Sequence, residues 1–173
     1  MDMEKVTGAC KQGDDMLVGK NTNLYRVQYR GSTPLFKIYK VPCKIGPVNF
    51  WTMKELPDGR VMFMGSDFNF YMASGDTVES VGDNIFPFVK GGVAARMKYA
   101  VAGMNYANSQ YWCSFTLASG GTTNDRSVVM DWSSPYQDKW GNRQYPWFIY
   151  SIGAFGFAEI NLSGQTGLYH GGY

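Results

Sequence analysis

The sequence has almost no excess of charge of either sign. Its 16 Lys and Arg residues are nearly matched by 14 Asp and Glu residues, which leaves a net charge of +2 over 173 residues. Binding to nucleic acid or to an anionic membrane surface draws on concentrated positive charge, so this balance gives no reason to expect either partner. Lys90, Arg96 and Lys98 are the nearest approach to a basic patch, and we interpret them as a solvated face.

Histidine and cysteine are also scarce. The one histidine, His170, lies in a glycine-rich stretch that is poorly suited to the fixed geometry of a Ser-His-Asp or Cys-His catalytic system. A single histidine excludes a histidine-based zinc site, and Cys10, Cys43 and Cys113 do not have the spacing of a metal motif. We therefore expect reduced structural thiols, with Cys113 buried in a strand, and neither a metal ion nor a cofactor.

Long apolar runs and amphipathic helical patterns are missing as well. No stretch reaches the apolar length that a membrane helix needs, and the first 15 residues lack the apolar segment of a signal peptide. Synthesis in a cytoplasm, without an export signal, is the expectation. Residues 83–96 contain Pro87 and the pair Gly91-Gly92, so any helix there should be no longer than a turn or two, as in a connector.

Short aromatic and β-branched segments fill the rest of the chain, separated by Gly, Asp, Asn and Ser turns. Residues 60–64 and 68–73 should pair as a hairpin through Gly65 and Asp67. The run SQYWCSFTLA from Ser109 alternates with the period of a strand, and residues 126–132 are its expected partner. The pattern predicts an all-β protein.

The strands recur in units of roughly forty residues, as the blades of a β-propeller do. The units cover residues 16–41, 49–81, 100–152 and 154–173, and the last is short. We predict a β-propeller-like fold with four-stranded antiparallel blades, incomplete or few-bladed. Residues 1–15 should be a flexible N-terminal tail and residues 16–173 a single β-propeller-like domain.

Paired carboxylates are the remaining enzymatic option, because propellers host glycosidases and such enzymes need two suitably spaced acids. Asp131 and Glu159 lie in predicted strands, and Asp67 and Asp76 lie in turns. A strand acid can equally face water or accept a hydrogen bond from a neighbouring amide, so turn and surface roles account for these residues. We expect no catalytic residues.

A polar and aromatic insert at residues 133–144 is long for a hairpin loop. Tyr136 and Trp140 lie in it and Tyr145 follows it, and long loops with aromatic side chains often carry recognition. The alternative is a packed Ω-like loop that covers a sheet edge. A carbohydrate-binding or receptor-binding propeller adhesin, stacking sugars on Trp140, is therefore the second functional hypothesis.

Several short motifs resemble a recurring segment of tailed-bacteriophage virion proteins, namely the β-propeller proteins of the tail nozzle and DNA-stabilisation type. The resemblance covers the chain from Leu24 onward and includes a motif of Asn124, Arg126 and Asp131. The other matching positions are residues 31–36, 44–46, 61–67, Tyr71 and 83–85. None of these motifs is a catalytic or ligand-binding motif, so the resemblance concerns fold and setting more than activity.

The resemblance implies a structural component of a bacteriophage tail, adaptor or nozzle region, located in the virion and made in the host cytoplasm. It implies assembly in place of catalysis, with other virion subunits and further copies of the chain as partners. The loops at residues 119–125 and 133–144 would make these contacts. The candidate contact residues are Asn124, Arg126, Tyr136, Trp140 and Tyr145.

Overall fold

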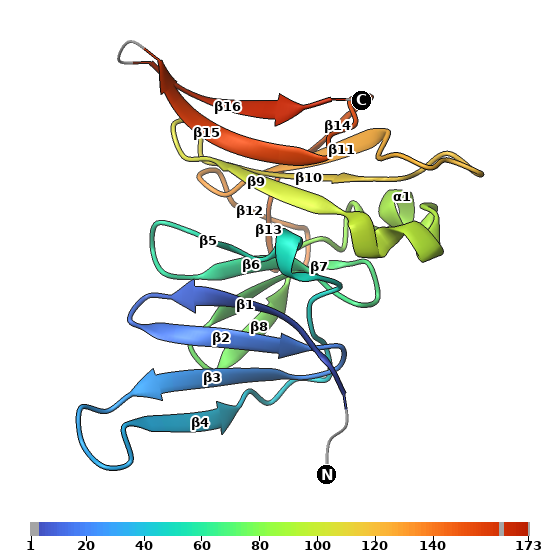
Figure 1. Ribbon diagram of the computed structural model, residues 1–173. Helices are drawn as coiled ribbons and strands as arrows, with labels where there is room; N and C mark the ends of the chain where they lie inside the picture. The colour runs from blue at the N-terminus through green and yellow to red at the C-terminus, as the bar shows by residue number, and fades with distance from the viewer. Residues whose placement is uncertain (1–3, 163–164, 173) are drawn as a thin grey trace. The chain divides into compact units, whose positions relative to one another are not determined.

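The computed structural model describes residues 4–162 and 165–172, and it is built almost wholly from antiparallel β-sheet (Figure 1). In this part of the chain, three sheets have four strands each and two have two strands each. The predicted all-β class and the four-stranded antiparallel sheets are confirmed. The chain divides into two compact units, Met1–Ser80 and Val81–Tyr173, where we expected one continuous domain.

The first sheet of the N-terminal unit is a meander in which each strand pairs with the next one in sequence. Its strands are β1 (Val6–Gln12), β2 (Asp15–Lys20), β3 (Leu24–Tyr29) and β4 (Phe36–Lys40). β1 lies inside the stretch that we expected to be a flexible tail, and this expectation is wrong for Val6–Gln12. Gly13, which has a φ of 60°, and Asp14 form a tight turn between β1 and β2. The pairing with β2 satisfies backbone hydrogen-bonding groups of β1.

The second sheet of this unit follows the same pattern and supplies the other side of its core. It consists of β5 (Lys54–Glu55), β6 (Val61–Met64), β7 (Phe70–Ser74) and β8 (Thr77–Ser80), and the short 3₁₀-helix η1 (Phe50–Thr52) precedes it. The predicted hairpin is therefore confirmed as β6 and β7. Apolar residues from both sheets form one buried cluster: Leu17, Leu24, Val41, Met53, Val61, Phe63 and Ala73.

The opposite face of the β1–β4 sheet remains exposed although it is mostly apolar. Cross-strand partners share a face, and the register pairs Met16 with Val27, Val27 with Ile38, and Tyr29 with Phe36. Tyr29 is 62% exposed, Phe36 59% and Ile38 66%. We call this surface, made of Met16, Val18, Tyr25, Val27, Tyr29, Phe36 and Ile38, the outer apolar face.

The C-terminal unit begins with the connector predicted from Pro87. It forms one short helix, α1 (Phe86–Lys90), with Pro87 in its first turn, and a 3₁₀-helix, η2 (Ala94–Tyr99). None of the helices in the described part of the chain is long and apolar enough to cross a membrane.

The four-stranded sheet of the C-terminal unit has the order β14-β11-β10-β9. Its strands are β9 (Val101–Asn105), β10 (Gln110–Phe115), β11 (Arg126–Asp131) and β14 (Trp147–Tyr150). The predicted pairing of the SQYWCSFTLA run with residues 126–132 is confirmed, and Cys113 is fully buried. Tyr111 is buried beside it, and this burial raises the pKa of the Tyr111 hydroxyl well above its usual value.

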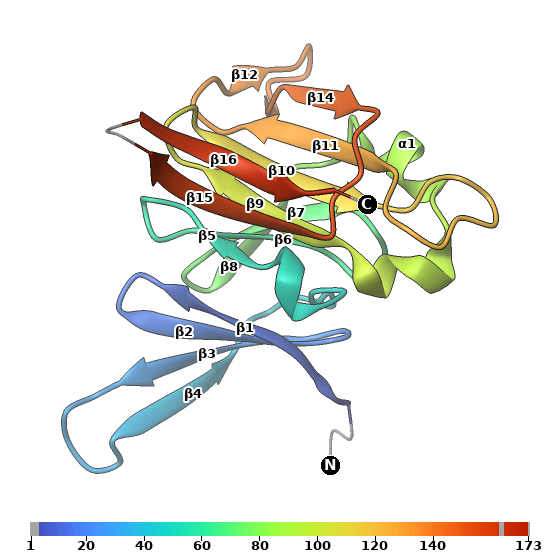
Figure 2. The same ribbon diagram turned by 45° about the horizontal axis from the view of Figure 1, so that its top comes forward.

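A long hairpin of β15 (Gly156–Leu162) and β16 (Gln165–Gly171) covers one face of this sheet (Figures 1 and 2). The Phe157 ring lies 6.4 Å from the Trp112 ring, which in turn stacks on Tyr150 at 5.1 Å. Gly103 makes this close approach possible, because a Cβ there would lie 2.3 Å from the Cβ of Phe157.

Candidate functional site

The insert at residues 133–144 folds as a small hairpin rather than as an irregular loop. Its strands are β12 (Tyr136–Gln137) and β13 (Arg143–Gln144). Asp138 organises the turn between them, because its Oδ1 accepts hydrogen bonds from the backbone N–H of Trp140 at 2.8 Å and of Asn142 at 2.9 Å. Gly141 completes the turn with a φ of 85°. The tip that carries Trp140 is therefore held by hydrogen bonds from its backbone N–H groups to the Asp138 side chain.

The same hydrogen bonds stabilise the ionised form of Asp138. Partial desolvation opposes the charge, but donors from Asn142, Trp140 and Gly141 outweigh it and hold the pKa of the Asp138 carboxyl below its usual value. Asn142 contributes twice, through its backbone N–H and through its side-chain Nδ2 at 3.1 Å from Oδ2.

A hollow of about 410 Å³ opens beside this turn. Two aromatic rings, two carboxylates and three carboxamides line it, contributed by Tyr136, Trp140, Asp83, Asp138, Asn84, Asn142 and Gln144. Trp140 is 74% exposed, and the Lys139 ammonium lies 4.3 Å from the centre of its ring. Asn84 ties the insert to the connector, since its Nδ2 donates to the Tyr136 hydroxyl at 3.3 Å and to the Tyr145 carbonyl at 3.1 Å.

The structure brings together two of the five predicted contact residues, Tyr136 and Trp140, in this hollow. Tyr145 is only 1% exposed, so its predicted role as a surface contact is wrong. Its ring is buried, and the Arg143 guanidinium lies 5.3 Å from the ring centre. The sequence pattern could not separate Tyr145 from Tyr136, because a short insert offers no long periodicity from which to assign a face.

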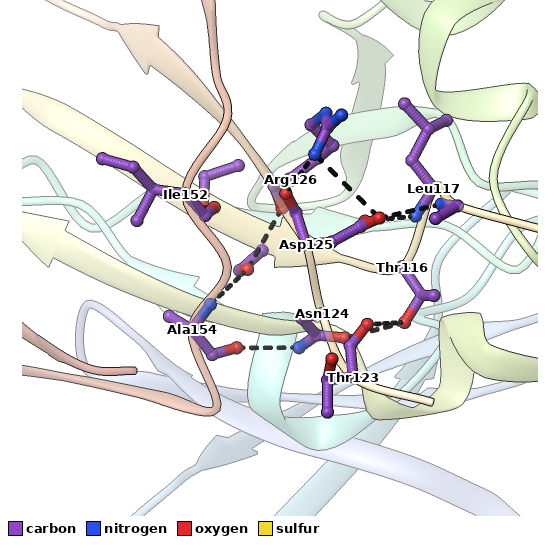
Figure 3. Close-up of polar contacts among 11 residues, drawn as sticks. Thr116, Leu117, Thr123, Asn124, Asp125, Arg126, Ile152 and Ala154 are labelled. Atoms are coloured by element: carbon purple, nitrogen blue, oxygen red, sulfur yellow. Dashed lines mark hydrogen bonds and ion pairs between the residues drawn. The ribbon is translucent and has the colours of Figure 1, made fainter. Parts of the chain in front are cut away.

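Asn124 is also a buried residue and not a contact, with 3% exposure. Its Nδ2 donates to the Ala154 carbonyl at 2.8 Å, and its Oδ1 accepts from the Thr116 hydroxyl at 3.3 Å (Figure 3). The same Nδ2 donates to the Tyr99 carbonyl at 3.1 Å. The predicted contact role of Asn124 is therefore wrong. Its amide joins three segments that are far apart in the sequence.

Two serines of the sheet hold the same chain segment after β14. The Ser127 hydroxyl donates to the Ile152 carbonyl at 2.7 Å, and the Ser114 hydroxyl accepts from the Ala154 N–H at 2.9 Å. Both serines are fully buried. We call residues 152–154 the strap, because these bonds and those of Asn124 fasten it across the end of the sheet.

Arg126 is the fifth predicted contact residue, and it remains partly exposed. Its Nη1 lies 4.0 Å from an Asp125 carboxylate oxygen and donates to the Asp125 backbone carbonyl at 2.7 Å. Asp125 in turn accepts from the backbone N–H groups of Leu117 at 2.7 Å and Ala118 at 2.9 Å. The loop at residues 119–125 is thus closed at its base by Asp125, and Arg126 stays accessible outside the hollow.

We expect Asn124→Ala to lower the free energy of unfolding by about 2 to 3 kcal/mol, because it leaves the buried Ala154 carbonyl and the partly buried Tyr99 carbonyl without their donor. Urea denaturation followed by circular dichroism measures the change. Asn142→Ala is the matched control, since Asn142 is exposed and its loss should cost under about 1 kcal/mol. An equal loss in both variants would contradict the assigned role of Asn124.

Each of the four candidate carboxylates accepts a hydrogen bond or pairs with an arginine. Asp131 accepts from the N–H and hydroxyl of Ser133, and Glu159 accepts from the Tyr106 N–H at 3.2 Å. Asp67 accepts from the Tyr71 hydroxyl at 2.6 Å, and Asp76 pairs with Arg26 at 3.1 Å. Within residues 4–162 and 165–172, no group of three or more His, Cys, Asp or Glu residues is placed to hold a metal ion.

The residues of the hollow that sequence reasoning missed are Asp83, Asn84, Asp138, Asn142 and Gln144. The spacing Asp-x-Trp-x-Asn at residues 138–142 is typical of a turn in which the aspartate side chain accepts hydrogen bonds from the backbone, and it could have been used to predict this turn. Asn84 gave no such signal, because it is 52 residues from Tyr136 in the chain.

No known protein-family model matches this chain, and no curated protein sequence matches it.

Proposed function

We propose that this protein is a structural subunit that assembles with further copies of itself through apolar sheet faces, in the setting of a bacteriophage virion. The observation that carries the proposal is the outer apolar face of the β1–β4 sheet. Soluble monomers rarely leave a contiguous surface of this kind open to water, and such surfaces commonly mark protein contacts.

The outer apolar face has the composition of an interface core. Tyr25, Tyr29 and Phe36 are aromatic, and Ile38, Val27 and Val18 are β-branched. The Tyr29 and Phe36 rings already contact one another, with centroids 5.7 Å apart. Three lysines share this face: Lys20, whose ammonium lies 5.4 Å from the centre of the Tyr25 ring, Lys11 of β1 opposite Met16, and Lys40 of β4 opposite Tyr25. Because β1 and β4 are the edge strands of the sheet, these lysines fit the charged rim of an apolar centre.

The β15–β16 hairpin supplies a second surface suited to assembly. Cross-strand pairing places Ala158 opposite Tyr169 and Ile160 opposite Gly167, on the face turned away from Phe157. A shallow groove of about 380 Å³ runs over this hairpin, between Phe155 and Tyr169. In the described chain β16 pairs only with β15, and a strand edge of this kind can pair with another chain.

The virion setting rests on the resemblance of the motifs from Leu24 onward to tail nozzle and DNA-stabilisation proteins. Four-stranded meanders, each formed by consecutive strands, are also what the blades of a β-propeller require. A propeller-like stacking of such sheets is the architecture that we propose for the assembled form. Other virion subunits would then be further partners, and the virion tail the location.

The double substitution Phe36→Lys with Ile38→Lys should abolish the oligomer and leave a folded monomer. Both side chains are exposed, so the change removes interface area and adds repulsion without touching the core. Mass photometry and sedimentation velocity measure the mass, and circular dichroism checks the fold. We expect the dissociation constant of the oligomer to rise by at least about a hundredfold.

Phe50→Lys is the matched control, because Phe50 is an exposed aromatic residue of the same unit that lies on η1 and outside the outer apolar face. It should leave the oligomer intact. A wild-type chain that stays monomeric at micromolar concentration, or a double variant with unchanged mass, would refute the proposed role of this face.

A further inference from the structure

The assembly surfaces proposed above do not include the hollow beside the β12–β13 turn, and the chemistry of the hollow indicates a ligand. We propose that it is a binding site for a neutral, hydroxyl-rich ligand, namely an uncharged glycan, with Trp140 as the stacking platform. The inference rests on three properties of the hollow: an exposed aromatic ring, a balanced set of charges, and donors and acceptors held in fixed positions.

Trp140 is the apolar part of the site. An indole that is 74% exposed at the tip of a hairpin contributes nothing to a core, so its exposure is not explained by folding. The Lys139 ammonium lies over the ring at 4.3 Å from its centre, so a sugar would place its C–H groups on the other face of the indole. Tyr136 adds a second aromatic ring with a hydroxyl on the wall of the hollow.

The charges around the hollow disfavour ionic ligands of both signs. Asp83 and Asp138 line it and repel phosphates and acidic sugars. Lys139 already lies over the Trp140 ring, which a cationic ligand would need for an aromatic cage. The two carboxylates of the lining are matched by Lys139 and Arg143 of the same hairpin, which lie outside the lining, and a neutral ligand is the class that none of these charges repels.

Hydroxyl groups both donate and accept hydrogen bonds, and the hollow offers both functions. The carboxylates of Asp83 and Asp138 accept, while the carboxamides of Asn142 and Gln144 can do either. Polar groups and an aromatic ring in the lining of one hollow therefore match the hydroxyl groups and the apolar face of one sugar ring.

The site is also held in shape before any ligand arrives. Asp138 fixes the positions of Trp140 and Asn142 through their backbone N–H groups, and Asn84 anchors the Tyr136 hydroxyl. Preorganisation of this kind lowers the entropy cost of binding, which matters for a ligand with few apolar contacts.

A glycan array of neutral and sialylated oligosaccharides, followed by calorimetric titration with the best neutral binders, tests the proposal. We expect binding to neutral glycans only, at least about tenfold weaker affinity for Trp140→Ala, and partial retention for Trp140→Phe, which keeps an aromatic ring. The expected affinity is unchanged in the Phe36→Lys/Ile38→Lys variant, so failure of assembly and failure of glycan binding can be told apart.

Trp51→Ala is the matched control, because Trp51 is an exposed tryptophan on η1 that does not line the hollow. Its affinity should equal that of the wild type. The proposal is overturned if the array gives no signal above that of Trp140→Ala, if sialylated glycans bind as well as neutral ones, or if Trp51→Ala and Trp140→Ala lose affinity equally.

Discussion

Replacing Gly153 with alanine should destabilise the C-terminal unit by at least about 3 kcal/mol, more than an ordinary surface substitution. A Cβ at this position would lie 1.8 Å from the Asn124 carbonyl oxygen and 2.9 Å from the Asp125 Cα. Both are backbone atoms and cannot rotate away. The strap would have to lift, which would break its hydrogen bonds to Asn124, Ser114 and Ser127.

Urea denaturation and amide hydrogen exchange of β10 and β11 measure this loss. Gly156→Ala is the matched control, because a Cβ there would meet no atom within 4 Å and should change the stability by less than about 1 kcal/mol. Equal stability of Gly153→Ala and the wild type would show that the strap does not lie against the loop as described.

Phe63→Ala should lower the stability of the N-terminal unit by about 3 to 5 kcal/mol. Phe63 is fully buried in the cluster with Leu17 and Leu24, and its ring stacks on Tyr71 with centroids 5.7 Å apart. Truncation removes this contact and leaves a cavity between two sheets that are both hydrogen-bonded along their strands and cannot collapse to fill it.

Amide hydrogen exchange in β6 and β7 is the suitable measurement, because it reports on the N-terminal unit by itself. Phe50→Ala provides the comparison, since Phe50 is about half exposed and its loss should cost under about 1 kcal/mol. If exchange in β6 were equally protected in Phe63→Ala and the wild type, the cluster would not be the main support of this unit.

The strands were predictable where side chains alternate over several residues. The β10 sequence QYWCSF and the β6–β7 hairpin carried both the period of a strand and clear turn residues. β1 was missed because its residues, VTGACKQ, are small or polar and lack the aromatic residues of the other strands. Its place is fixed by pairing with β2, and such a tertiary effect overrides local propensity.

The candidate site was predictable only in part. Trp140 and Tyr136 could be singled out because aromatic residues in a polar insert have no evident core role. Asn124 and Tyr145 could not be assigned to the interior, because their burial depends on segments distant in sequence: Tyr99 and Ala154 for Asn124, and Asn84 for Tyr145. In the sequence, a turn residue next to a strand has the same pattern whether its side chain faces solvent or forms hydrogen bonds with the backbone of a distant segment.

The meander order of the sheets bears on how the chain folds during synthesis. In β1–β4 and β5–β8 every pairing joins neighbours in sequence, so each closes a short loop at low entropic cost. The N-terminal unit can therefore form as it leaves the ribosome, before β9 has been translated. The C-terminal unit is different, because β11 pairs with β14 only after the whole β12–β13 insert, and the β15–β16 hairpin packs on β9 across more than 50 residues.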